Sequence, residues 1–153
     1  EIKEKNKNLK LHMVGKLQTN KVKSALKIFD FIHSLDNLKL AKKISEEQKN
    51  FLNKPKIFIQ INIGNEPQKS GLDKHQIEDF YNQCIKLDLN IVGTMCLPPI
   101  GSEPEIYFSE MKKITNILSL NEMSMGMSED YLKAVIYYST YLRIGSKIFG
   151  ARS

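Results

Sequence analysis

Two short segments near the carboxyl end of the sequence combine the residue types that bind anions. Residues 124–128 are Ser-Met-Gly-Met-Ser, followed by two acidic residues, and residues 143–146 are Arg-Ile-Gly-Ser. Ser128 is predicted to cap the amino end of a helix, where unpaired backbone N–H groups attract negative charge. Gly145 lets the backbone approach a ligand closely, and Ser146 adds a hydroxyl and an N–H. Together the two segments predict a phosphate site.

Each segment taken alone also has a purely structural interpretation. A serine before two acidic residues is a common helix cap, and Gly145 is compatible with an ordinary strand end. Arg143 is expected to face the same side as Gly145, because side chains two apart on a strand share a face, or else to form a surface salt bridge. Both segments end the last two predicted strands, where α/β barrels often bind phosphate, and this favours the phosphate site.

Short apolar runs alternate with longer amphipathic stretches along the sequence, a pattern typical of βα units and a parallel sheet. The apolar runs predict strands at residues 11–15, 31–36, 56–63, 91–97, 123–127 and 141–146. Apolar residues at intervals of three and four predict helices over residues 38–52, 73–85 and 108–118. Because no repeat or linker interrupts the pattern, we expect residues 1–153 to form a single domain.

The strand predicted at residues 56–63 indicates what its two faces contact. Its isoleucines alternate with Phe58, Gln60 and Asn62, so one face is apolar and the other partly polar. This alternation suits a barrel whose helices cover the isoleucine face. A complete (β/α)8 barrel has about 250 residues and rarely fewer than about 200. The 153-residue chain therefore fits either an open doubly wound sheet or an incomplete barrel.

Composition narrows the classes of protein to which the chain can belong. Apolar residues make up 41% and charged residues 26%, as in globular domains. No apolar run approaches the roughly 20 residues that cross a membrane, so we predict no membrane association. The net charge of +6 would suit nucleic acid, but only two of the 23 basic residues are arginines and lysines occur from end to end. We predict a small anionic ligand, with a basic nucleic-acid-binding domain as an alternative.

The two cysteines predict no disulfide. Cys84 lies on the apolar face of a predicted helix and Cys96 inside a predicted strand, so both are expected to be buried free thiols. That pattern suits a reducing, cytoplasmic compartment. Neither cysteine has a partner at the spacing of zinc ligands, so we predict no metal site.

Several motifs follow one another in the order of a known family. They are residues 11–21 (Leu-His-Met-Val-Gly-Lys-Leu-Gln-Thr-Asn-Lys), 60–63 (Gln-Ile-Asn-Ile) leading to 69–71 (Lys-Ser-Gly), 92–95 (Val-Gly-Thr-Met), 126–130 (Gly-Met-Ser-Glu-Asp) and 143–152 (Arg-Ile-Gly-Ser-Lys-Ile-Phe-Gly-Ala-Arg). The chain resembles the pyridoxal phosphate homeostasis proteins, which share the barrel of the alanine-racemase group and lack its second domain. The match covers nearly the whole chain.

The resemblance implies that the chain binds pyridoxal 5′-phosphate and takes part in vitamin B6 homeostasis as a carrier or buffer, without substrate turnover. The residues that would contact this cofactor are Ser128, Gly145, Ser146 and the Met127 backbone at the phosphate, Arg143 at the pyridine nitrogen, and His12 and Met95 in the pocket wall. An arginine at that nitrogen weakens the ring as an electron sink, which favours holding the cofactor over transforming it. His12 is equally compatible with a hydrogen-bonded core histidine.

The resemblance is incomplete near the start of the chain. The family's Schiff-base lysine ends its first barrel strand, and a Gly-Glu-Asn segment belongs to the second; neither has a counterpart here. We therefore expect strands three to eight of a (β/α)8 TIM-type barrel, without the first two βα units and without a catalytic residue. A racemase or decarboxylase of the same group is the alternative, although its paired acid–base groups are not evident. We expect a monomer or weak dimer.

Overall fold

The computed structural model describes residue 6 and residues 8–150 of the chain. The strands of this part are β1 (His12–Met13), β2 (Phe31–Leu35), β3 (Lys56–Ile61), β4 (Ile91–Cys96), β5 (Glu122–Met127) and β6 (Tyr141–Arg143). The helices are η1 (Thr19–Lys21), α2 (Val22–Ile28), α3 (Leu38–Gln48), η2 (Lys74–Gln76), α4 (Ile77–Lys86), α5 (Pro104–Ile117), α6 (Tyr131–Ile136) and α7 (Ser146–Phe149). All six predicted strands are therefore confirmed.

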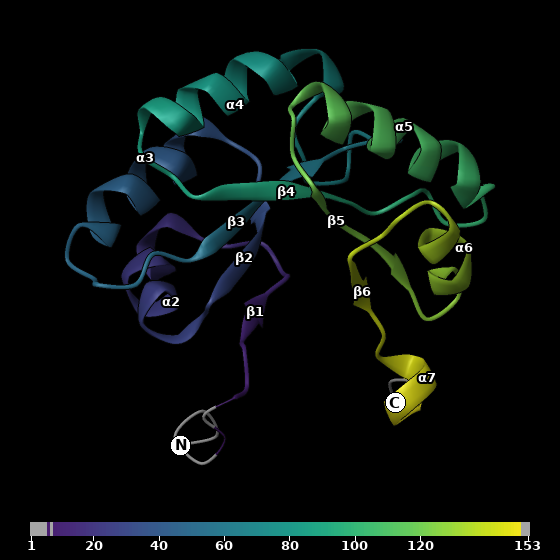
Figure 1. Cartoon of the computed structure of the whole chain (residues 1–153), viewed down its shortest axis with the longest axis horizontal. Helices are drawn as coiled ribbons and strands as arrows, with labels where there is room; N and C mark the ends of the chain where they lie inside the picture. The colour runs from purple at the N-terminus through teal and green to yellow at the C-terminus, as the bar shows by residue number, and fades with distance from the viewer. Residues whose placement is uncertain (1–5, 7, 151–153) are drawn as a thin grey trace.

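The order of the strands decides between the two architectures that the sequence allowed. The sheet has the order β1-β2-β3-β4-β5-β6, and each neighbouring pair is parallel. Right-handed crossovers between consecutive strands place every connecting helix on the same face of the sheet. Figure 1 shows the result, with helices α2 to α6 arranged around the outside of a curved sheet. The fold is a six-stranded parallel half-barrel, and an open doubly wound sheet is excluded.

The outer face of the sheet and the helices share the main hydrophobic core. Ile57, Ile59, Ile61 and Ile63 are all buried there, at 3% exposure or less. Their helix partners in this core include Leu40, Ile44, Phe80, Phe108 and Met111. Burying one such side chain contributes roughly 1.5–3 kcal/mol, so this layer holds the helices to the sheet. The predicted orientation of the isoleucine face is confirmed.

The predicted boundaries were wrong at several element ends, for reasons that lie outside the local pattern. Helix α3 ends at Gln48 rather than near residue 52, and Leu52 is fully exposed. The N–H groups of Asn50 and Phe51 donate to the carbonyls three residues back, at Glu47 and Gln48, so the chain tightens into a turn where the helix ends. Strands β1 and β6 are shorter than predicted, with two and three residues. Each has a neighbour on one side only, so few backbone hydrogen bonds define its length.

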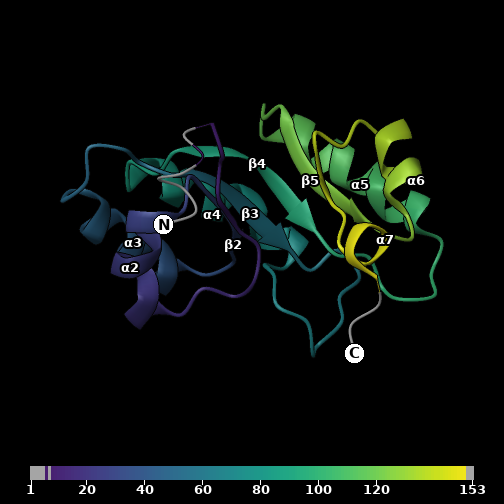
Figure 2. The same cartoon turned by 90° about the horizontal axis from the view of Figure 1, so that it is seen from below.

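The order of the elements places the two halves of the chain toward opposite ends of the curved sheet. Figure 2 shows helices α2 and α3 toward the left end and α5, α6 and α7 toward the right end. Within the described residues, no helix is both long and apolar enough to cross a membrane. Both cysteines are buried free thiols, as predicted.

Gly93 in β4 is required for the close approach of β4 to β5. A Cβ at this position would lie 2.1 Å from the Glu122 carbonyl oxygen, and backbone cannot yield as a flexible side chain can. We expect Gly93→Ala to lower the free energy of unfolding by about 1–3 kcal/mol, the usual range for overpacking. Urea denaturation measures this change. Gly15→Ala is the matched control, since a Cβ at Gly15 meets nothing within 4 Å; an equal effect of both substitutions would contradict the prediction.

Candidate functional site

A cavity of about 800 Å³ opens where the loops after β4, β5 and β6 meet. These loops follow the carboxyl ends of parallel strands, the end at which α/β folds bind ligands. Five of the seven residues proposed from the sequence line this cavity: Met127, Ser128, Arg143, Gly145 and Ser146. The structure thus brings together the two segments that predicted a phosphate site, although they are separated by the whole of α6.

Ser128 does not cap the helix that follows it, and that prediction was wrong. Helix α6 begins at Tyr131, with Asp130 at its N-cap position. The Ser128 hydroxyl oxygen instead accepts hydrogen bonds from the backbone N–H groups of Gly145 and Lys147, each at 3.3 Å. Ser128 therefore connects the end of β5 to the start of α7. Within the described residues its own O–H donates to no acceptor, so that proton can point into the cavity.

The other residues predicted at the phosphate site differ in which backbone and side-chain groups they leave unpaired. The Met127 N–H donates to Asp130 Oδ1 at 2.6 Å, so this backbone donor is already engaged. A Cβ built on Gly145 meets no atom within 4 Å, so the backbone there borders open space. Ser146 is exposed at the first position of α7 and lines the cavity. Gly145 therefore offers room, although its N–H already donates to Ser128. Ser146 offers donors, and Met127 contributes its side chain.

Arg143 is fixed by two hydrogen bonds to neighbouring strands. Its Nη1 donates to Ser124 Oγ and its Nη2 to the Cys96 carbonyl oxygen, each at 2.8 Å. Its Nε is buried and has no partner among the described residues. Burial lowers the pKa of Arg143, against the opposing influence of Cys96 and Asp130. The guanidinium stays charged, and three of its five N–H groups have no acceptor among the described residues.

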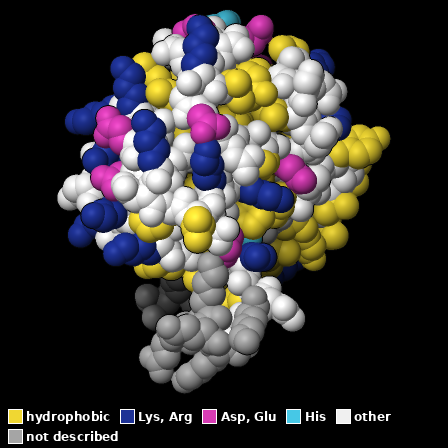
Figure 3. Space-filling view, turned by 60° about the vertical axis from the view of Figure 1, so that its left-hand side comes forward, with side chains coloured by type: hydrophobic (Ala, Val, Ile, Leu, Met, Phe, Trp, Pro, Cys, Tyr) yellow, Lys and Arg dark blue, Asp and Glu magenta, His cyan; other side chains and the backbone are white. Residues whose placement is uncertain are grey.

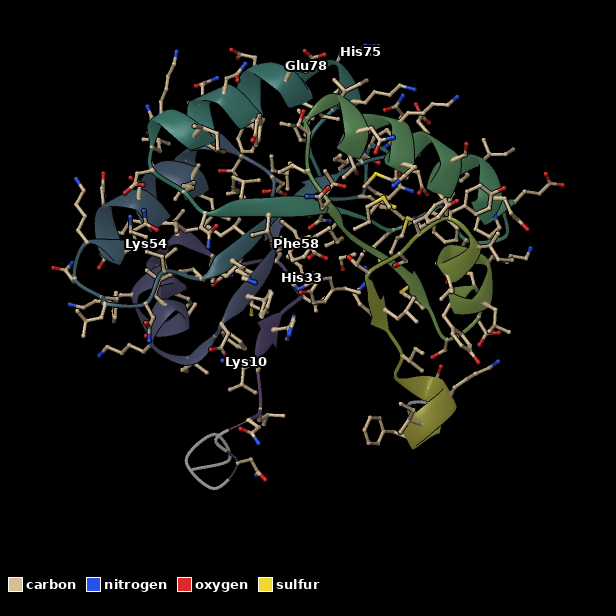
Figure 4. The ribbon with its side chains drawn as sticks, viewed as in Figure 1. Lys10, His33, Lys54, Phe58, His75 and Glu78 are labelled. Carbon is tan, nitrogen blue, oxygen red and sulfur yellow. The ribbon has the colours of Figure 1, made fainter. Side chains whose placement is uncertain are left out.

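A second cavity, of about 470 Å³, adjoins the first at β6. Arg143 and Gly145 line both cavities, and His12, His33 and Tyr141 also line the second. The His12 Nδ1 and His33 Nε2 atoms are 2.9 Å apart. Figure 4 shows His33 beside Phe58 on the inner side of the sheet. His33 was missed by the sequence analysis; its position two residues after Phe31 on one strand was the available signal.

Met95 lies apart from both cavities. It is buried in an inner cluster with Phe31 and Phe58 and lines neither space. No group of three metal-binding side chains occurs among the residues that the structure describes.

The sequence matches a known family over its whole length. Residues 1–153 match the family described as alanine racemase, N-terminal domain. The pyridoxal phosphate homeostasis protein of Synechocystis is 35% identical, over 92% of this chain and 69% of that protein. The protein of the same name from Pasteurella multocida is 32% identical, over 97% of this chain and 69% of its own length. The chain belongs to the pyridoxal phosphate homeostasis protein family.

Solved structures agree with this family membership. PipY of Synechococcus elongatus, with PLP bound, is 30% identical and superposes with a TM-score of 0.89, covering 97% of this chain and 74% of PipY. The arginine decarboxylase of Paramecium bursaria Chlorella virus is 15% identical with a TM-score of 0.68, over 95% of this chain and 48% of that one. At that identity the decarboxylase shares the fold alone.

His33 makes the stability of the fold depend on pH. Burial, with the nearby His12 and Arg143, lowers the pKa of His33 to about 3, whereas the unfolded chain has a histidine pKa near 6.5. The unfolded state therefore binds more protons between these values, and stability falls as the pH drops below about 6.5. Between pH 7 and pH 5 we expect His33 to account for a loss of about 2 kcal/mol, measured by urea denaturation.

His33→Phe is the comparison for this measurement, because it keeps a ring against Phe58 and removes the titrating group. The variant should lose about 2 kcal/mol less than the wild type over the same pH interval. Equal losses in both proteins would show that His33 does not carry the pH dependence.

Proposed function

We propose that this chain binds pyridoxal 5′-phosphate in the 800 Å³ cavity and serves as a carrier or buffer of the cofactor, without turning over a substrate. The observation that carries the proposal is the convergence of Ser128, Gly145, Ser146 and Arg143 on that cavity. The similarity to PipY, a protein whose structure contains PLP, supports it.

The donors of this site fit the cofactor group by group. The Ser128 and Ser146 hydroxyls and the open backbone at Gly145 suit the phosphate oxygens, which are acceptors only. Arg143 lines the cavity and keeps N–H groups that donate to no described acceptor, and these suit the pyridine nitrogen, which is an acceptor when it carries no proton. Bound pyridoxal phosphate supplies an electron-withdrawing ring, and that capacity weakens when the nitrogen stays unprotonated. Arg143 thus favours storage over catalysis.

We further propose that β1 to β6 correspond to strands three to eight of a (β/α)8 barrel, in one domain over residues 1–153. Consecutive parallel strands support this assignment, as does the coverage of only 69% of the relatives and 74% of PipY. The position of the phosphate site after β5 and β6 also agrees, because barrels often bind phosphate after their last two strands. The buried free thiols support a reducing, cytoplasmic location.

A second candidate function rests on the distribution of charge. The first 56 residues contain 14 of the 21 lysines and only 6 of the 17 acidic residues. Figure 3 shows Lys and Arg side chains crowded over the left part of one face of the molecule. A cavity of about 790 Å³ on this half is lined by Lys10, Lys27, Lys54 and Lys56, with the carboxylate of Asp30. Such a surface favours a polyanion, so nucleic-acid binding stays the alternative.

Removal of one phosphate-site hydroxyl tests the first proposal. We expect wild-type protein to bind pyridoxal 5′-phosphate more tightly than pyridoxal, and Ser146→Ala to weaken binding of the phosphate form about tenfold, the loss of one charge-assisted hydrogen bond. Isothermal titration calorimetry measures both affinities. Ser24→Ala is the matched control, an exposed serine on α2 far from β6. Equal affinity for the two compounds would contradict the phosphate site.

Charge reversal separates the second candidate function from the first. Lys54→Glu with Lys56→Glu should leave the affinity for pyridoxal 5′-phosphate unchanged, since neither lysine lines the phosphate cavity. If the lysine-rich half binds nucleic acid, the same pair should abolish salt-dependent binding of a fluorescent oligonucleotide in an anisotropy titration. Lys112→Glu with Lys113→Glu on α5 is the control pair. No oligonucleotide binding by wild-type protein would rule this candidate out.

A further inference from the structure

His12 and His33 form a fixed pair on the inner face of the sheet. They come from the neighbouring strands β1 and β2, with His12 Nδ1 and His33 Nε2 2.9 Å apart. His12 stacks on Phe31, with ring centroids 4.1 Å apart, and His33 stacks on Phe58 at 4.2 Å. Tyr141 packs its ring edge against His33 at 5.9 Å. These contacts hold both imidazoles in place. The two nitrogens are close enough for a hydrogen bond, so one proton lies between them.

The burial of His33 decides which ring donates that proton. His33 is 1% exposed, and its Nδ1 is buried without a partner in the described part of the chain. A proton on Nδ1 would leave a buried N–H donor unpaired, which is rarer in proteins than an unpaired acceptor. The proton of His33 therefore belongs on Nε2, which donates to His12 Nδ1. Burial lowers the pKa of both histidines, so both are neutral near pH 7.

The tautomer of His12 follows from this bond. A neutral imidazole carries one N–H, and its Nδ1 is the acceptor here, so the proton of His12 is on Nε2. His12 is partly exposed and lines the 470 Å³ cavity together with Arg143 and Gly145. No acidic residue lines that cavity. Its wall therefore combines N–H donors from His12 and the cationic Arg143, and the nearby carboxylates of Asp30 and Asp130 lie outside this cavity.

We infer that His33 is a positioning residue that locks His12 as the Nε2–H tautomer. His12 then donates a hydrogen bond, beside Arg143, to an acceptor atom of the ligand where the ligand extends from the 800 Å³ cavity past Arg143 into the 470 Å³ cavity. The ligand part of this inference rests on the proposed function. A wall of donors next to a cation discriminates among phosphorylated pyridines. It favours a ring whose substituents are acceptors, such as the aldehyde of pyridoxal 5′-phosphate, over the ammonium group of pyridoxamine 5′-phosphate.

Affinities for these two compounds test the role of His12. We expect wild-type protein to prefer pyridoxal 5′-phosphate, and His12→Phe, which keeps a ring against Phe31, to bind it about tenfold more weakly, with a smaller change for the amine. His12→Gln keeps an N–H donor and should restore part of the affinity. His75→Phe is the matched control, since His75 is exposed far from His33 (Figure 4).

The role of His33 has a separate measurement that requires no ligand. The chain has three histidines, so nitrogen-15 NMR can resolve the protonated nitrogen of each ring. We expect His12 to be the Nε2–H tautomer in the wild type and a mixture of tautomers in His33→Phe. This spectrum does not change with a general loss of stability as long as the variant is folded, so it separates positioning from a merely structural role.

The outcomes separate this inference from the proposed function. A His12 Nδ1–H tautomer in the wild type overturns the role of His33, and His12→Phe binding as tightly as the wild type overturns the role of His12. If wild-type protein binds neither compound, the proposed function fails and the ligand part of this inference fails with it, while the spectrum still decides the role of His33. If His12→Phe does not fold, His12→Gln is compared with the wild type instead. Its side chain carries an acceptor carbonyl beside the N–H donors, so its preference for pyridoxal 5′-phosphate over pyridoxamine 5′-phosphate should be smaller than that of the wild type.

Discussion

The carboxyl end of the sheet depends on one guanidinium. Arg143 extends from β6 to Ser124 on β5 and to the Cys96 carbonyl at the end of β4, and so connects three strands. Two of its N–H groups donate to the protein, and its Nε is buried without a partner among the described residues. The planar fork makes this division possible, because a lysine in its place could not bond two strands in fixed directions. In the proposed site, support of the fold and recognition of the ligand would use different N–H groups of one side chain.

The inner and outer faces of the sheet are built from different residue types because they have different tasks. The outer face is aliphatic and holds the helices, whereas the inner face gathers rings, with Phe31, Phe58 and the two histidines stacked in pairs. Because aromatic rings are large, few of them fill the interior of a half-barrel. The two imidazoles also bring polar atoms that form a hydrogen bond with each other there. The interior is therefore rigid enough to define the direction of individual N–H groups.

The sequence predicted those features that depend on neighbouring residues along the chain. The strands and the isoleucine face followed from an alternation of period two, and the cavity residues followed from two short motifs. The predictions failed where a partner lies far away in sequence: the Ser128 hydroxyl bonds to Lys147, 19 residues on, and His33 bonds to His12, 21 residues back.

The uneven distribution of lysines has a consequence for how an anionic ligand reaches the protein. The lysine-rich half and the candidate site lie toward opposite ends of the curved sheet, so the excess of positive charge is remote from the candidate site. At low ionic strength this long-range field draws a dianion toward the wrong half. Salt screens this field, because a Debye length of about 8 Å at physiological ionic strength is shorter than the distance across a small domain. Binding of the anionic ligand at the candidate site then depends on short-range contacts alone.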